Sequence, residues 1–302
     1  MDRFFRFISA AAVIVMMTAG ACSAGPRADA ASGGDTATAT DTTPFPLKAA
    51  VDTLEVSTSH IASPAKCVVA VPSSLMSSWG SDSTDYPVVY LLHGYDGTYA
   101  DWSKAVDLAA LADRYGFIIV CPDGRDSWYW DSPVDSCMQM ESYMIDDLVP
   151  YIDEILPTAE CAITGLSMGG HGAMWLAMRH PSVFSAAGSM SGGLDLAKFP
   201  GKWGTSKVLG RYDGDLAIWR DHSVMSLLPS LKPGELDIIF DCGEGDFFYR
   251  VNCAMDSALT ARGIPHTFTH RPGNHSWRYW VESLPAHLDF FKASIDGNAK
   301  TH

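Results

Sequence analysis

The stretch that decides the fold is "CAITGLSMGGHGAMWLAMRHP", which runs from Cys161 to Pro181. Its first four residues form a short apolar run typical of a strand, and the small residues from Gly169 onward are typical of a tightly packed helix. Ser167 stands at the junction, within the pattern Gly-x-Ser-x-Gly. Glycine permits a sharp turn and the close approach of a neighbouring segment. The pattern occurs in ordinary glycine-rich turns, but it also predicts a nucleophile elbow that holds a serine hydroxyl at the end of a sheet.

Strand-like and helix-like segments alternate on both sides of this junction. Two apolar runs lead the chain, and six more follow, each closed by glycine, proline or a polar turn; they cover residues 51–59, 66–72, 86–94, 117–124, 161–165, 184–193, 236–243 and 266–273. Helical patterns fill 102–116, 141–156 and 250–263, and Pro150 should kink the second of them. The order predicts one α/β domain over 45–295, with a mostly parallel sheet buried on both faces and helices on both sides.

Residues 194–235 fit this alternation least well. The segment contains Trp203 and Trp219 among glycines and charged residues, between two expected strands. Insertions at strand ends commonly form the walls of a site in α/β sheets. We therefore expect a lid or specificity segment here, although a surface excursion with packed aromatic residues has the same composition.

The N-terminal residues have the composition of a targeting segment. Residues 1–22 combine a short basic start with an apolar run of secretory-signal length, too short for a comfortable membrane span. The run ends in "TAGAC", which resembles a bacterial lipobox with Cys22 as the lipidated residue; ordinary cleavage nearby is the alternative. Residues 23–44 read as a flexible tether and 296–302 as a tail. We expect an exported protein, either lipid-anchored in the cell envelope or released into the periplasm or medium.

Charge and cysteine usage restrict the partners. The formal net charge of −14 argues against nucleic acid and anionic membrane surfaces as binding partners. The lipid anchor is then the expected membrane contact.

The six cysteines beyond Cys22 permit disulfides without fixing their pairing. Cys121, Cys161 and Cys242 adjoin apolar runs, so buried thiols are expected there. No Cys-x-x-Cys or His-x-x-x-His spacing indicates zinc, and we expect neither a metal nor an organic cofactor.

A serine nucleophile requires a histidine base and a carboxylate that orients it. In the chain order typical of an elbow serine, the acid follows the next-to-last strand and the histidine follows the last one. His275 lies in the loop after the last apolar run, in "PGNHSWRYW". Asp241, Glu244 and Asp246 all follow the preceding strand in "DCGEGDFFYRVN". Position ranks Asp246 first, because it lies farther into the loop beside aromatic residues, but it does not exclude Asp241.

An oxyanion also needs backbone donors. One should be the amide of Met168, directly after the serine, and the other should come from the loop after an early strand. "YLLHGYDG" supplies that loop, and Tyr95 is named for its amide rather than its ring. His93, in the same loop, is expected to be a structural hydrogen-bonding residue.

The segments "LLHGYDG", "GLSMGGHGAMWLAMRHP", "FSAAGSMSGG", "DCGEGDFFYRVN" and "PGNHSWRYW" together resemble the esterase D-like branch of the α/β-hydrolases. That branch includes tributyrin esterases, S-formylglutathione hydrolases, antigen-85 mycolyltransferases, and the acetylxylan and feruloyl esterases of carbohydrate esterase family 1. The resemblance spans about residues 86–291 and implies an α/β-hydrolase fold. It places Ser167, Asp246 and His275 on the triad positions and Tyr95 and Met168 on the oxyanion positions, and so favours Asp246 over Asp241.

The function that follows is a serine carboxylesterase acting through an acyl-enzyme. We expect short or aromatic acyl groups (acetyl, butyryl or feruloyl) on a carbohydrate alcohol, because no long apolar segment suggests a fatty-acid tunnel. Aromatic faces suit a sugar or phenolic ring, and the candidates for substrate contact are Trp128, Tyr129, Trp130 and Trp203, with Trp219 as a further one. The alternatives are acyl transfer to a sugar acceptor and a non-catalytic surface carbohydrate-binding lipoprotein.

Overall fold

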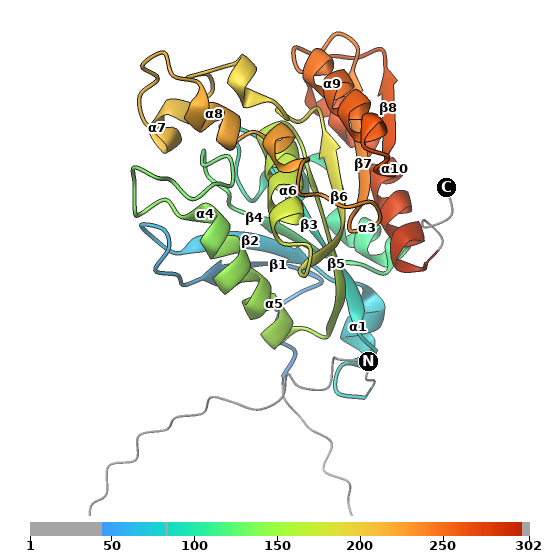
Figure 1. Cartoon of the computed structure of the whole chain (residues 1–302). Coiled ribbons are helices and arrows are strands. Elements are labelled where there is room, and N and C mark those ends of the chain that lie inside the picture. The colour runs from blue at the N-terminus through green and yellow to red at the C-terminus, as the bar shows by residue number, and fades with distance from the viewer. Residues whose placement is uncertain (1–43, 82–83, 298–302) are drawn as a thin grey trace, which may run out of the picture. The chain divides into compact units, whose positions relative to one another are not determined.

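An eight-stranded sheet forms the centre of the structure, a computed structural model that describes residues 44–81 and 84–297 (Figure 1). The strand order is β1-β2-β4-β3-β5-β6-β7-β8; β1 and β2 pair antiparallel with their neighbours, and the pairs from β3 and β4 onward are parallel. The strands are β1 (Val51–Val56), β2 (Ala65–Ala70), β3 (Tyr86–Leu92), β4 (Ile118–Pro122), β5 (Thr158–Gly165), β6 (Phe184–Met190), β7 (Asp237–Gly243) and β8 (Thr267–Arg271). All eight expected strands and the mostly parallel sheet are confirmed. The expected signal peptide with Cys22, most of the tether and residues 298–302 lie outside the described residues.

Helices surround the sheet. The longer ones are α3 (Leu108–Tyr115), α5 (Val149–Ile155), α6 (Met168–Arg179), α9 (Tyr249–Ala261) and α10 (Trp277–Ile295). The shorter ones are α1 (Ser73–Ser78), α2 (Asp101–Ala105), α4 (Met140–Ser142), α7 (Thr205–Leu209) and α8 (Ala217–Asp221), with 3₁₀ turns at Leu196–Lys198 and Val224–Leu227 and a π-helical turn at Tyr143–Leu148.

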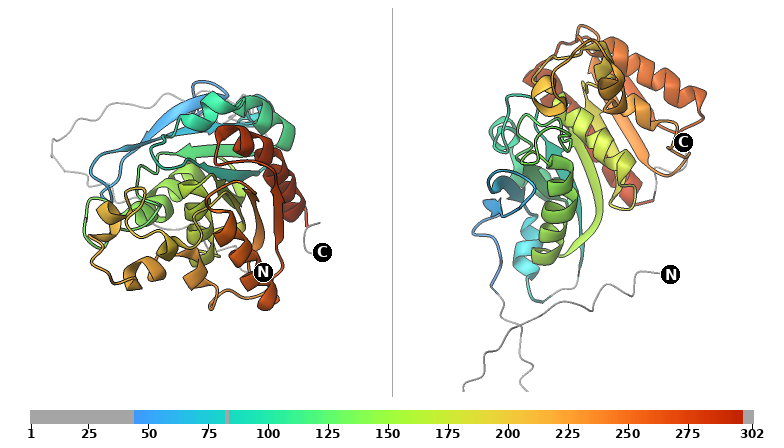
Figure 2. Two further views of the ribbon diagram at one scale, coloured as in Figure 1. Left: turned by 90° about the horizontal axis from the view of Figure 1, so that it is seen from above. Right: turned by 60° about the vertical axis from the view of Figure 1, so that its left-hand side comes forward.

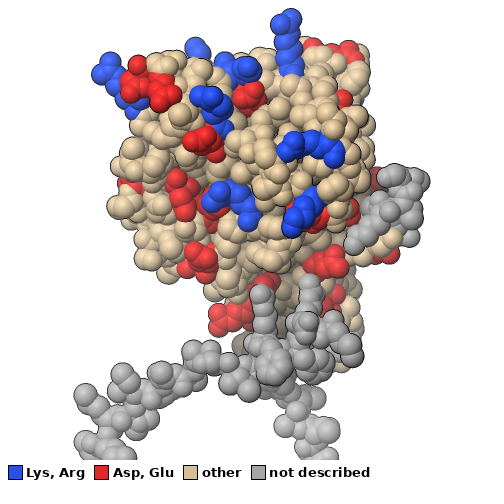
Figure 3. Space-filling view, in the orientation of Figure 1, with Lys and Arg blue, Asp and Glu red and all other residues tan. Residues whose placement is uncertain are grey.

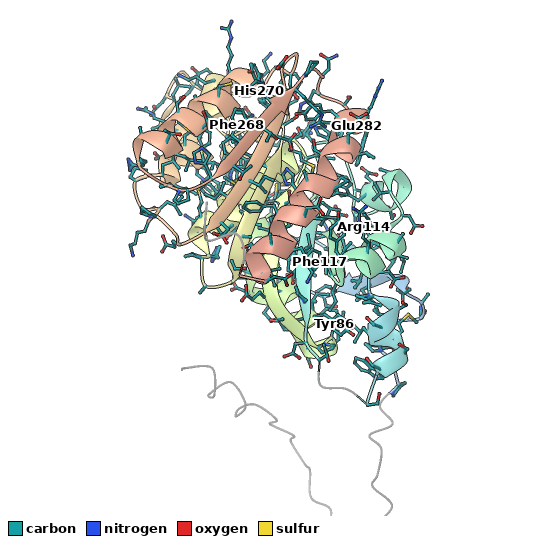
Figure 4. All side chains as sticks on the ribbon, turned by 90° about the vertical axis from the view of Figure 1, so that its right-hand side faces the viewer. Tyr86, Arg114, Phe117, Phe268, His270 and Glu282 are labelled. Carbon is teal, nitrogen blue, oxygen red and sulfur yellow. The ribbon has the colours of Figure 1, made fainter. Side chains whose placement is uncertain are left out.

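The two faces of the sheet carry two separate apolar clusters. Successive residues of a strand point to opposite faces, and β3 shows the consequence: Val88, Tyr90 and Leu92 join one cluster, whereas Val89 and Leu91 join the other. Helices α5, α6 and α9 contribute to the first cluster, and α3 and α10 contribute to the second (Figure 2). In Figure 4, α10 crosses this second face, with α3, marked by Arg114, beside it. Burial of both faces explains why the central strands are apolar throughout.

β8 does not fit the expected burial. The sequence predicts a strand buried on both faces, but β8 is the edge strand, and the side chains of Thr267, Thr269 and His270 are exposed. Figure 4 shows Phe268 and His270 on this outer strand. The polar Thr and His residues in "HTFTHRPG" are the signal of an edge position. A strand at the edge of a sheet is covered less completely than a central strand and exposes more of its side chains to solvent.

Two expected helices are irregular. The helical pattern over 102–116 divides into α2 and α3, because Asp107 leaves the helical conformation and its carboxylate accepts the Ala110 amide as the N-cap of α3. The expected kink at Pro150 takes the form of a π-helical turn over the six residues before Val149, where the changed hydrogen-bonding pattern accommodates a residue without an N–H in the continuing helix.

Parallel strands bring their carboxyl ends to one edge of the sheet, where ligands of α/β proteins bind. The segments after β3, β5, β7 and β8 therefore converge at this edge. On the face drawn in Figure 3, basic side chains are interspersed with acidic ones rather than gathered in one patch. Among the described residues, no helix is both long enough and apolar enough to cross a membrane.

Candidate active site

Ser167 lies in the turn between β5 and α6, as the Gly-x-Ser-x-Gly pattern predicts. Its backbone has φ 55° and ψ −114°, a strained conformation for a residue with a side chain. A Cβ at Gly165 would lie 2.6 Å from the Gly169 carbonyl carbon, and a Cβ at Gly169 would lie 2.5 Å from the backbone oxygen of His93. The two glycines are therefore needed for close packing, since α6 begins directly against the end of β3. This packing holds the strained serine in place.

Three side chains from separate segments form a continuous hydrogen-bonded chain. His275 Nε2 lies 2.9 Å from Ser167 Oγ, and His275 Nδ1 lies 2.7 Å from Asp246 Oδ2. Asp246 is buried, and its other oxygen accepts the Phe248 amide at 2.8 Å, which fixes the carboxylate. Because Asp246 accepts from Nδ1, Nε2 is left to take the serine proton.

Aromatic rings surround the histidine. Phe247 lies 4.3 Å from the His275 ring, Trp280 lies 4.9 Å away and Phe248 lies 5.6 Å away, measured between ring centroids. The rings limit access of water to the bond between His275 and Asp246. A less solvated bond is electrostatically stronger.

The loop after β3 lies against the serine. A Cβ at Gly94 would lie 3.5 Å from Ser167 Cβ, within van der Waals contact, and 2.6 Å from Leu166 Cδ1, the end of a side chain that would have to move. Within the described part of the chain, the amides of Tyr95 and Met168 donate no hydrogen bond. His93 fixes the loop: its Nδ1 donates to the Gly94 carbonyl at 2.7 Å, and its Nε2 accepts the Gly124 amide at 2.8 Å.

The serine opens into a pocket of about 430 Å³. One wall is the loop after β3, another is the start of α10, and a third combines Phe247 with Trp203 from the 194–235 segment, whose rings stack at 5.3 Å. The described residues that line it are Gly94, Tyr95, Asp96, Gly97, Asp101, Leu166, Ser167, Trp203, Phe247, His275, Ser276, Trp277 and Trp280. An ester group could thus reach the serine between aromatic walls.

Comparison with known proteins gives the family. The family model described as "Putative esterase" matches residues 60–291. The chain belongs to this esterase family. It is 27% identical to an acetyl esterase of Caldicellulosiruptor saccharolyticus, over 66% of this chain and 80% of that protein. It is 23% identical to an S-formylglutathione hydrolase of Rattus norvegicus, over 69% of this chain and 83% of that protein.

The fold agrees with this assignment. A solved ferulic acid esterase superposes with a TM-score of 0.69 and 25% identity, covering 81% of this chain and 97% of that structure. The sheet and its covering helices are those of an α/β-hydrolase. The esterase is therefore a carboxylic ester hydrolase.

Three of the aromatic residues expected to contact substrate are in the core instead. Trp128, Tyr129 and Trp130 are at most 1% exposed, so the expectation that they stack on a substrate is wrong. The segment turns inward through positive φ values of 57° at Trp128 and 61° at Tyr129. Trp219 is equally buried.

The first turns of α6 provide the surface on which these rings pack. Tyr129 fills the space that a side chain at Gly172 would occupy, and Trp128 and Trp130 make edge-to-face contacts with the His171 ring, with ring centroids 5.4 and 5.0 Å apart. Burial lowers the pKa of His171 to about 3, so the ring is neutral in this core. These aromatic residues support the helix that carries the serine turn.

Besides Tyr95, the aromatic residues that line the pocket are Trp203, as expected, together with Phe247, Trp277 and Trp280. The sequence signal for the last three was their position beside Asp246 and His275. Trp277 is anchored by an edge-to-face contact with Trp102 of α2, at 5.1 Å.

Asp241 belongs to a second buried network. It accepts hydrogen bonds from His287 Nε2 at 2.8 Å and from Ser283 Oγ at 2.8 Å, both on α10. His287 Nδ1 in turn lies 2.9 Å from Thr164 Oγ1 on β5. Gly188 of β6 leaves room for this ring, because a Cβ there would lie 2.4 Å from His287 Nδ1. Glu244 contacts His270 in an exposed position. Neither Asp241 nor Glu244 contacts His275.

The two aspartates should respond differently to the same substitution. Asp241→Asn replaces one of the two acceptor oxygens with an NH2 group, so that the buried N–H of His287 faces a second donor instead of an acceptor. The substitution should lower the free energy of unfolding by about 1–3 kcal/mol. Asp246→Asn should reduce kcat on the order of 10⁴-fold, because His275 loses the acceptor that selects its tautomer. Urea denaturation and kcat of both variants provide the comparison. A large loss of kcat in Asp241→Asn with full activity in Asp246→Asn would reverse the assignment.

Proposed function

We propose that the enzyme is a serine carboxylesterase that works through an acyl-enzyme. The observation that carries the proposal is the chain of hydrogen bonds from Ser167 through His275 to Asp246, at 2.9 and 2.7 Å, with Ser167 and His275 lining the pocket. A serine hydroxyl is a weak nucleophile until a base removes its proton. The geometry provides that base and the carboxylate that orients it.

In the first half-reaction, Ser167 Oγ attacks the ester carbonyl carbon while its proton passes to His275 Nε2. The carbonyl oxygen becomes an oxyanion that the amides of Tyr95 and Met168 stabilise, since no protein group uses these donors within the described residues. Asp246 stabilises the imidazolium. His275 then gives the proton to the departing alcohol, and the acyl group remains on Ser167.

In the second half-reaction, water replaces the alcohol. His275 Nε2 accepts a proton from the water, whose oxygen attacks the acyl carbon, and the same amides hold the oxyanion. Collapse of the intermediate returns the proton to Ser167 Oγ and releases the carboxylic acid. A sugar hydroxyl in the place of water would make the enzyme a transferase, which the accumulation of an acylated sugar would reveal.

Ser167→Ala tests the nucleophile. The variant should fold normally, because Ser167 Oγ forms its hydrogen bond with His275 alone among the described residues. Hydrolysis of a short-chain ester should fall by a factor on the order of 10³ to 10⁶, as for other coupled triads. The matched control is Ser185→Ala on β6, because the Ser185 hydroxyl makes a single hydrogen bond to the described residues, to the Cys161 carbonyl. Activity of Ser167→Ala within tenfold of wild type would exclude the assignment.

The proposed substrates are short or aromatic acyl esters, with a carbohydrate as the alcohol. Aromatic walls at Trp203, Phe247 and Trp277 suit the faces of sugar or phenolic rings. Two relatives, named an acetyl esterase and a ferulic acid esterase, support the same acyl groups. A glutathione thioester is less favoured, because an exported protein would rarely meet that cytoplasmic compound.

The dependence on acyl length separates this proposal from a lipase. We expect kcat/KM for acetyl, butyryl and feruloyl esters to exceed that for long fatty-acyl esters, since the aromatic walls of the pocket suit a short or ring-bearing acyl group better than an extended alkyl chain. The measurement is kcat/KM for a series of esters with acyl chains from two to about sixteen carbons. A rising trend toward long chains would contradict the proposal and make the 194–235 segment a lipase lid.

We further propose that the enzyme is exported and held at a membrane by a lipid on Cys22. Support comes from the basic start, the apolar run and the lipobox-like end of residues 1–22. Metabolic labelling with a fatty-acid analogue should tag the wild-type protein and not Cys22→Ser. An unlabelled wild-type protein, recovered wholly soluble from the periplasm or medium, would leave only ordinary secretion.

A further inference from the structure

The Asp, Glu, Lys and Arg residues that line the pocket, among those the structure describes, are all acidic. The described residues around it include two aspartates, Asp96 and Asp101, and no lysine or arginine. Asp101 is engaged: its carboxylate accepts the amide and hydroxyl of Thr98, and it forms an ion pair with Lys104 at 3.2 Å. Asp101 is thereby partly neutralised.

Asp96 is not engaged in this way. Its side chain is exposed, and its carboxylate has neither a hydrogen bond nor an ion pair with any residue that the structure describes. It directly follows Tyr95, whose amide is a proposed oxyanion donor. Among the described residues that line the pocket, Asp96 is therefore the negative charge without a compensating partner.

The backbone holds Asp96 in this position. Its φ of 58° lies in the left-handed region, and its amide donates to Asp126 Oδ1 at 2.8 Å. Desolvation, together with the carboxylates of Asp126 and Asp96, raises the pKa of the Tyr95 hydroxyl. The Tyr95 ring also contacts the 194–235 segment, since a Cβ at Gly204 would lie 2.8 Å from Tyr95 Cε2. The loop that carries Asp96 is thus fixed from two sides.

We propose that Asp96 makes this pocket selective against esters that carry a negative charge near the reacting bond. The substrates are then neutral esters, such as those on an uncharged sugar, rather than esters of uronic acids, phosphorylated alcohols or glutathione. The inference rests on the proposed esterase function and names the substrate class of the same pocket. The aromatic walls contact the apolar faces of such a substrate, and Asp96 repels an anionic one.

A matched set of esters tests the charge alone. The compounds are the neutral 3-acetoxybenzamide, the anionic 3-acetoxybenzoate and the cationic 3-acetoxy-N,N,N-trimethylanilinium. Each kcat/KM is divided by the rate constant for alkaline hydrolysis of the same compound, which removes differences in the intrinsic reactivity of the esters. A second pair, 4-nitrophenyl fumaramate and 4-nitrophenyl hydrogen fumarate, places the charge on the acyl side, and the trans double bond keeps the carboxylate from attacking its own ester. In at least one series, the neutral ester should be preferred over the anionic one by about tenfold at low ionic strength, the effect of one charge a few ångströms away. The cationic ester should show no such disadvantage.

Asp96→Asn should reduce that preference several-fold, and molar salt should reduce it in the wild-type enzyme, because salt screens exposed charges. Asparagine tolerates the left-handed backbone conformation, so the loop should be preserved. The control is Glu154→Gln, which removes one exposed negative charge from α5, the helix that leads into the start of β5 at the opposite edge of the sheet. Glu154→Gln should leave the ratio unchanged.

Two failures can be told apart. If all esters are cleaved with dependence on Ser167 but the neutral and anionic compounds react equally in both series, the charge selectivity is wrong and the esterase function stands. The charge selectivity is also wrong, with the esterase function intact, if Asp96→Asn retains the wild-type preference. If none of the esters is cleaved, the proposed function fails, and the charge selectivity fails with it.

Discussion

The close packing of α6 against the ends of β3 and β5 is the constraint on which the site depends. Gly165 and Gly169 have no room for a Cβ, and together they let α6 meet the ends of β3 and β5 within van der Waals contact. Ser167 must then adopt a positive φ to leave the strand and enter the helix. Its hydroxyl lies at the carboxyl edge of the sheet as a consequence, in reach of the loops after β7 and β8. The strain is tolerated because the surrounding core fixes the turn.

A second interaction connects the sheet to the helix that follows His275. The hydrogen bonds among Thr164, His287, Asp241 and Ser283 join β5 and β7 to α10. Thr164 lies three residues before Ser167, and Asp241 lies five residues before Asp246. The network thus joins the strand that leads to the serine, the strand that leads to the acid and the helix that begins after the histidine. The network is buried, so it connects rigidly the elements that lead to the proposed catalytic residues.

Much of this arrangement could be predicted from the sequence, because it depends on local rules. Apolar runs closed by glycine indicated the strands, and the order serine, acid, histidine located the site residues. The structure places Asp246 beside His275, in the loop where aromatic residues had favoured it over Asp241. The direction in which an aromatic side chain points is a property of tertiary structure. Trp128, Tyr129 and Trp130 therefore could not be recognised as core residues, since their inward turn depends on the unexpected positive φ values at Trp128 and Tyr129.

The edge position of β8 and the role of Asp96 were missed for a related reason. Each depends on what lies beside the residue, and the sequence does not show which neighbour is absent. β8 has a strand on one side only, and Asp96 has no cation beside it among the described residues. Asp96 lies within the motif "YLLHGYDG", but only the pocket around it gives its charge a consequence.

The most direct test of the central claim is to locate the activated serine chemically. A fluorophosphonate transfers its phosphonyl group to a nucleophilic serine with loss of fluoride, so peptide mass spectrometry identifies the residue. The account predicts one phosphonyl group per chain, on the peptide containing Ser167, and much slower labelling in His275→Ala. Labelling of another residue, or equally fast labelling of Ser167 without His275, would contradict it.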